Sequence, residues 1–159
     1  MRKNVKQQLA LRVLSTAALV AMVSSIATAA FAAEYNVAEG SVEIVAKDGS
    51  QRITQWEDKD NNLCVKDGEG KDIRDREDSK IVLVTKDETT GETKPTSNTV
   101  TITAEEKGDT ANVTLKDVFI NREGARNSDA EAALTVKGDG DTNIELNGNN
   151  TLSSTGAHA

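Results

Sequence analysis

Asp139 and Asp141 have the residue type and spacing that could bind a hard divalent cation. They alternate with glycine between two segments whose patterns predict strands. Carboxylate oxygens gathered at a corner between adjacent strands can coordinate Ca²⁺, with backbone carbonyls and water completing the shell. We therefore expect these two residues to be the metal ligands if the protein binds calcium. An ordinary corner turn without a metal is the alternative.

A second acidic segment comes close to the spacing of a calcium loop. Asp58, Asp60, Asn62 and Glu69 fall at its first, third, fifth and twelfth positions. The sixth position is Leu63, where such a loop needs glycine for its sharp turn, and no helical pattern flanks the segment. The segment is therefore interpreted as a solvated acidic turn.

Trp56 is the candidate for stacking against the apolar face of a sugar ring. Between residues 33 and 159 the only other aromatic residues are Tyr35 and Phe119. An indole offers a large, rigid apolar face and a polar N–H at its edge. A single tryptophan is a small platform for a glycan, so packing in the core is the alternative interpretation of Trp56.

The residue types that catalysis needs are scarce. His158 is the single histidine and lies next to the last residue, which argues against a Ser-His-Asp triad and a histidine-based metal site. Cys64 is the single cysteine, so no disulfide forms within the chain. Its apolar neighbours Leu63 and Val65 favour a buried structural thiol over a reactive one. We therefore expect no enzymatic activity and assign no catalytic residue.

Short alternating strands must position these side chains. Residues 98–120 and 132–152 each contain a set of such strands separated by turn residues. Their apolar positions align at a separation of about 30 residues: Val100 with Leu134, Val113 with Ile144, Leu115 with Leu146 and Ile120 with Leu152. A strand period of two within this longer period predicts an all-β fold in which coils of strands stack on one another, a β-solenoid.

The chain divides into a less regular half and a repetitive half. Residues 33–97 are predicted to form an N-terminal cap and an irregular first turn, with strands at 41–46 and 80–84. Residues 98–159 are predicted to form about two coils without a recognisable closing element, so we expect an incomplete solenoid. In the first of these coils the expected inward residues are Val100, Ile102, Val113, Leu115, Val118 and Ile120.

Residues 1–32 have the features of an export signal. A positive start is followed by the uncharged stretch Val13–Ala33, and Ala30-Phe31-Ala32 fits a cleavage site. An uncleaved membrane anchor is the alternative.

Residues 1–32 contain four of the 19 Lys and Arg residues and none of the 26 Asp and Glu residues, which leaves a net charge of −11 on residues 33–159. We expect a secreted protein with no membrane span after signal removal, and this charge argues against binding nucleic acid.

The repetitive half resembles a known family. The segments ANVTLKDVFI (111–120), AALTVKGDGDTNIELNGNNTLSS (132–154) and GAHA (156–159) resemble the carbohydrate-binding-domain proteins exported by Gram-positive bacteria. The resemblance implies a right-handed parallel β-helix of pectate-lyase-like shape and an extracellular role in binding sugars, without established catalysis.

These observations together favour a secreted, non-catalytic carbohydrate-binding protein whose partner is a polysaccharide or glycan. Calcium would bridge the protein to an acidic polysaccharide. One alternative is a cell-surface adhesin or structural stalk that presents its solenoid to a host protein. Another is a fragment of a polysaccharide lyase whose catalytic coils lie beyond Ala159. Paired acids, or an arginine beside metal-binding acids on later coils, would favour the lyase.

Overall fold

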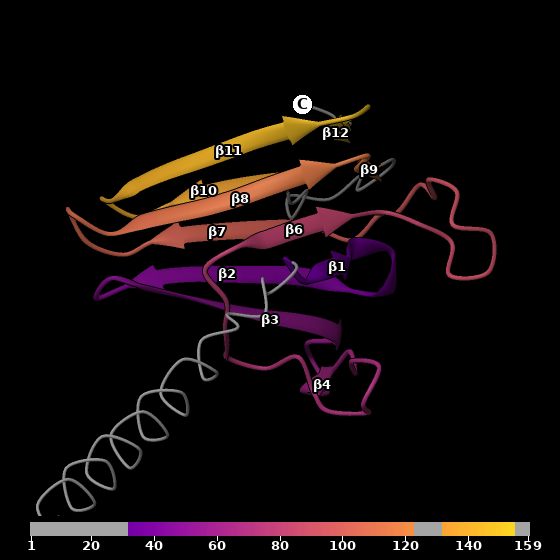
Figure 1. The fold of residues 1–159 in the computed structure, drawn as a ribbon, viewed down its shortest axis with the longest axis horizontal. Coiled ribbons are helices and arrows are strands. Elements are labelled where there is room, and N and C mark those ends of the chain that lie inside the picture. Colours follow the sequence, from indigo (N-terminus) through magenta and orange to yellow (C-terminus); the bar gives the residue numbers. More distant parts are fainter. Residues whose placement is uncertain (1–31, 123–131, 155–159) are drawn as a thin grey trace, which may run out of the picture. The chain divides into compact units, whose positions relative to one another are not determined.

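The computed structural model describes residues 32–122 and 132–154, and these residues fold mainly into β-strands (Figure 1). No α-helix occurs in this part of the chain. The all-β class predicted from the sequence is therefore confirmed. Apart from Ala32, the predicted export signal lies outside the described residues, and so does His158.

The described residues contain strands of two to nine residues and one short 3₁₀ helix. In chain order they are β1 (Glu34–Asn36), η1 (Val37–Glu39), β2 (Ser41–Lys47), β3 (Ser50–Asp58), β4 (Leu63–Cys64), β5 (Arg76–Glu77), β6 (Ile81–Val84), β7 (Val100–Ala104), β8 (Thr110–Lys116), β9 (Phe119–Arg122), β10 (Leu134–Lys137), β11 (Asp141–Asn147) and β12 (Thr151–Ser154).

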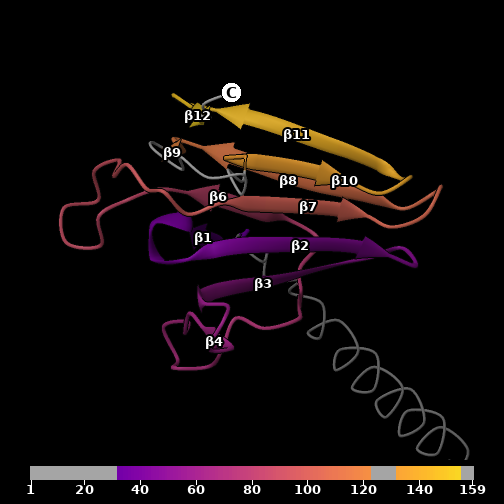
Figure 2. The same ribbon diagram turned by 180° about the vertical axis from the view of Figure 1, so that it is seen from behind.

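These strands form three sheets. The first has the order β1-β6-β8-β11 and is parallel throughout. The second has the order β10-β7-β2-β3-β4, parallel from β10 to β2 and antiparallel from β2 to β4, and β5 pairs with β3. The third is the parallel pair β9-β12. Figure 2 shows β10, β11 and β12 lying along β7, β8 and β9, and over the described residues no sheet closes on itself.

The register between the two repeats, β7-β8-β9 and β10-β11-β12, is the one predicted from the sequence. All four predicted pairs are partners across parallel strands: Val100 with Leu134, Val113 with Ile144, Leu115 with Leu146 and Ile120 with Leu152. Because a shift by one residue would turn each side chain to the other face, this agreement also fixes which residues face the interior.

Strands of the N-terminal half extend the same stacks. Val42 in β2 pairs with Val100, and Ile81 in β6 pairs with Val113, both in parallel. The strands predicted at 41–46 and 80–84 are thus present as β2 and β6. Beyond β2 the chain reverses in a two-residue turn at Asp48 and Gly49, whose φ angles of 51° and 74° match the twist of a hairpin. The hairpin places β3 antiparallel on the outer edge of β2.

Burial differs sharply between the two repeats. All six residues expected to face inward in the first repeat are at most 3% exposed. In the second repeat, Val136, Leu146 and Leu152 are 50%, 67% and 39% exposed, although the sequence pattern predicts that they face inward. The reason is that no described strand pairs with the outer edge of β10, β11 or β12. Stacked repeats bury apolar side chains mainly against their neighbours, so residues at an unpaired edge stay exposed.

The Asn150 side chain stabilises the corner between β11 and β12. Asn150 occupies the place in the second repeat that Val118 occupies in the first. Its Oδ1 accepts a hydrogen bond from the Val118 amide at 2.9 Å. Its Nδ2 donates to the Asn147 carbonyl at 3.0 Å. Both the oxygen and the nitrogen of this side-chain amide are therefore hydrogen-bonded to the backbone.

Candidate functional site

A hollow of about 310 Å³ lies beside Trp56 on the outer face of the second sheet. We call it the Trp56 hollow, and it is lined by Ser41, Val42, Glu43, Trp56, Lys59, Asp60, Thr99 and Thr101. The residues come from β2, from β3 and the turn after it, from β7 and from the residue that precedes β7. It therefore spans three neighbouring strands of one sheet.

Strand alternation and register bring these side chains together. Along β2 and β7 buried residues alternate with partly exposed ones, so Glu43 and Thr101 face away from the core. The two are direct partners across the parallel pair, while Ser41 is the partner of Trp56 across the antiparallel pair. A carboxylate, an indole and two hydroxyls thus share one face of a rigid sheet.

Trp56 is held in place from two directions. Its indole Nε1 donates to Glu43 Oε2 at 2.8 Å, and the guanidinium carbon of Arg74 lies 5.1 Å from the ring centroid. Arg74 is itself anchored, because it donates to both the side chain and the carbonyl of Asn62 at 2.9 Å. A cation–π contact at a partly exposed position contributes about 0.5–1 kcal/mol. The indole is half-buried, so it packs against its neighbours while still bordering the hollow.

Glu43 is the central charged group of the hollow. Burial raises the pKa of its carboxyl, but hydrogen bonds from Lys59 and Trp56 outweigh this effect and hold the pKa below its ordinary value. Lys59 Nζ donates to Glu43 Oε1, and Trp56 uses the other oxygen. The carboxylate is therefore ionised at neutral pH, and each oxygen retains a lone pair that can accept from a ligand hydroxyl.

Asp139 and Asp141 lie at the corner between β10 and β11, and both are exposed. Their backbone amides donate to the carbonyls of Glu105 and Asp109, at 3.4 and 2.9 Å, so this corner rests on the equivalent corner of the preceding repeat. Over the described residues, no three His, Cys, Asp or Glu side chains gather in a way that could hold a metal ion. The predicted pair has no third acidic side chain beside it there.

The acidic segment after β3 uses its side chains internally. Asp58 accepts hydrogen bonds from the amide and the side chain of Asn61, at 3.0 and 2.7 Å. Asn62 Oδ1 accepts from Arg74, and Glu69 pairs with Lys71 at 2.9 Å. These contacts agree with the interpretation of the segment as an acidic turn.

Cys64 is 5% exposed, which confirms the prediction of a buried thiol. Burial raises the pKa of the thiol, so the nucleophilic thiolate is disfavoured.

Sequence reasoning identified Trp56 but missed its partners in the hollow. The alternation in residues 41–46 indicates that Glu43 faces away from the core, and the same pattern in 98–104 indicates this for Thr101. Neither pattern reveals that β2 and β7, separated by more than fifty residues, are neighbours in register. The position of Lys59 depends on the turn after β3, for which the sequence has no comparable periodicity.

Comparison of the chain with protein-family models, with curated proteins and with solved structures finds no match in any of the three. No helix within the described residues is long and apolar enough to cross a membrane.

Proposed function

We propose that this chain is a secreted, non-catalytic carbohydrate-binding protein and that the Trp56 hollow is its glycan contact. The observation that carries the proposal is a half-buried indole, fixed by Glu43 and Arg74, at the border of a hollow lined by hydroxyl and charged groups. A sugar ring presents an apolar C–H face and a rim of hydroxyls. The hollow offers the indole to the apolar face and polar side chains to the hydroxyls.

The contacts within the hollow favour binding because they order its side chains before a ligand binds. Trp56 and Glu43 are joined by a hydrogen bond, and both lie on strands rather than on loops. Side chains that are already ordered lose little conformational entropy when a ligand binds. In this proposal the sugar stacks on the indole while its hydroxyls donate to Glu43 and exchange hydrogen bonds with Thr101.

The proposal also covers the architecture of the stacked repeats. We infer that the stacked repeats are coils of a right-handed parallel β-helix, which the parallel pairing of β7, β8 and β9 with β10, β11 and β12 supports. The resemblance of residues 98–159 to exported carbohydrate-binding-domain proteins supports both the helix and the export. Asp139 and Asp141 stay the proposed calcium ligands should an acidic polysaccharide be the partner.

The test is calorimetric titration of the chain with the glycans selected by an array of neutral and acidic polysaccharides. We expect Trp56→Ala to weaken binding by about tenfold or more, as the loss of a central aromatic contact does at other interfaces. Trp56→Phe keeps a ring and should retain most of the affinity. Circular dichroism checks that both variants are folded. Equal affinity in wild type and in folded Trp56→Ala would remove the hollow from consideration, and no bound glycan on the array would overturn the function.

A further inference from the structure

The second repeat ends in a strand edge that the described residues leave unpaired. No described strand pairs with the outer side of β10, β11 or β12, and Val136, Leu146 and Leu152 are exposed on these strands. Soluble proteins usually cover or blunt such an edge, because its free N–H and C=O groups can pair with another chain. β11 has seven residues and is the longest strand at this edge, so it offers the most backbone to a partner.

The backbone groups of β11 alternate between the side that faces β8 and the open side. The Asp141 N–H donates to the Asp109 carbonyl at 2.9 Å, and the Asn147 carbonyl accepts from the Asp117 N–H at 3.1 Å. Alternate residues of a parallel strand bond to the same neighbour, so the odd-numbered residues of β11 bond to β8. The even-numbered residues therefore direct their N–H and C=O groups to the open edge: Thr142, Ile144 and Leu146.

The sequence of β11 is complementary to itself in one antiparallel register. When Ile144 lies opposite the partner's Ile144, all seven residues of the strand pair, and the even-numbered residues exchange their free backbone hydrogen bonds. Glu145 then lies opposite the partner's Asn143, and Asp141 lies opposite the partner's Asn147. Each carboxylate thus faces a side-chain amide that can donate a hydrogen bond to it.

The two adjacent registers that keep inward residues opposite inward residues bring like charges together. A centre at residue 143 places Asp141 opposite the partner's Glu145, and a centre at residue 145 places Glu145 opposite the partner's Glu145. Like charges directly opposite each other destabilise a pair of strands. The register that pairs the whole strand is therefore also free of this repulsion, which favours a second copy of this chain as the partner.

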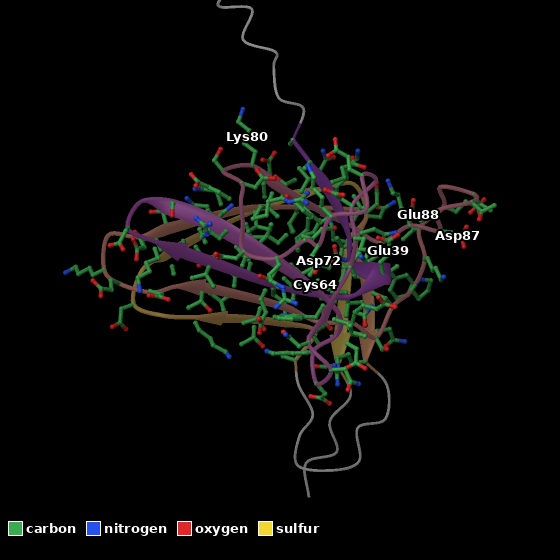
Figure 3. All side chains as sticks on the ribbon, turned by 90° about the horizontal axis from the view of Figure 1, so that it is seen from below. Glu39, Cys64, Asp72, Lys80, Asp87 and Glu88 are labelled. Carbon is green, nitrogen blue, oxygen red and sulfur yellow. The ribbon has the colours of Figure 1, made fainter. Side chains whose placement is uncertain are left out.

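The other end of the stack does not offer β11 a comparable partner. Figure 1 shows β3 and β4 at the end opposite β11, and Figure 3, which views the molecule from that end, shows Cys64 of β4 there. On that side the first sheet ends in β1, which has only three residues. A head-to-tail arrangement would leave most of β11 unpaired, whereas a two-fold arrangement pairs it completely and closes.

We propose that a second copy of this chain covers the open edge by two-fold, antiparallel pairing of β11 with the partner's β11, centred on Ile144. The first sheet then continues from one chain into the other. Ile144 already packs against the core, and in the dimer Leu146 is also removed from water, which favours association. In the monomer, which prevails at low concentration, Leu146 stays exposed. The proposal does not rest on glycan binding at Trp56.

Sedimentation velocity of the exported protein over a series of concentrations, up to the millimolar range, tests the association. We expect monomers to convert to dimers as the concentration rises, without larger species, because two-fold pairing uses up the open edge of both chains. A monomer at every concentration would leave the edge to some other partner and would overturn the proposal. Growth into assemblies larger than a dimer would overturn it as well.

Two variants of exposed residues on β11 test the register. Asn143→Glu places a carboxylate opposite the partner's Glu145, twice in the dimer, and should weaken dimerisation by at least about tenfold. Adding Glu145→Asn exchanges the two residues, so each carboxylate again faces an amide, and dimerisation should return.

The two variants are matched controls for each other. Both lose the hydrogen bond from Asn143 to Asn112, and the exchanged variant has the net charge of the wild type. Circular dichroism checks that both are folded. Undiminished dimerisation of Asn143→Glu would refute the pairing, and so would an exchanged variant that dimerises no better than Asn143→Glu.

Discussion

Leu115 and Leu146 are register partners on β8 and β11, and the structure predicts very different roles for them in stability. Leu115 is 1% exposed and Leu146 is 67% exposed. Leu→Ala removes three carbons, worth about 0.8 kcal/mol each when fully buried. At Leu115 the transfer loss is about 2.4 kcal/mol, and the cavity that remains raises the total to about 3–5 kcal/mol. At Leu146 about a third of the transfer term applies, which predicts a loss of about 0.8 kcal/mol.

Urea unfolding of wild type, Leu115→Ala and Leu146→Ala measures both losses under identical conditions. The midpoint should fall strongly for Leu115→Ala and slightly for Leu146→Ala, with an unchanged dependence on urea. The two changes delete the same atoms from neighbouring strands, so each variant is the control for the other. If Leu146→Ala lost as much stability as Leu115→Ala, Leu146 would be buried in solution. The explanation of its exposure by an unpaired strand edge would then be refuted.

Three further predictions concern acid stability, calcium and export. The hydrogen bond from Lys116 holds the pKa of Glu34 in the folded protein below its ordinary value. Above the pKa that Glu34 has in the unfolded chain, the pair therefore stabilises the fold. This stabilisation is lost as the pH falls through the lower pKa of Glu34 in the folded protein. Glu34→Gln should accordingly reduce the drop in unfolding temperature between neutral and acidic pH; an unchanged drop would contradict this. Calorimetry should show any calcium binding by the wild type weakened in the double variant Asp139→Asn, Asp141→Asn, and identical binding would remove the site. Sequencing of the exported protein should give an N-terminus near Ala33, whereas an intact start in the membrane fraction would indicate an anchor.

The stacking of the two repeats could be predicted from sequence because the spacing of similar residues determines the register between them. Val113 and Ile144, for example, occupy the same place in two alternating segments of comparable length. The pairing of β2 with β7 could not be predicted in this way. Val42 and Val100 are direct partners, but the chain between them contains the hairpin, β6 and two polar connections, and no repeat length links the two.

The candidate sites were less predictable than the fold, because each depends on contacts between segments without a common pattern. Trp56 was identifiable by its residue type, whereas its hydrogen bond to Glu43 follows from the register of the hairpin.

Two glutamines on the inner face of β3 differ in how their buried side-chain amides are paired. Gln51 is 6% exposed, and its Nε2 donates to the carbonyls of Asp78 and Asn112 at 3.0 and 3.1 Å. Its Oε1 accepts from the Asn112 amide at 2.6 Å, so both ends of this side chain are paired. Gln55 points to the same side four residues later, yet only its nitrogen is paired. The same strand thus pairs both ends of one buried amide and leaves the other with an unpaired acceptor. Because buried polar groups are paired almost everywhere in proteins, the unpaired oxygen of Gln55 is an exception on this face of β3.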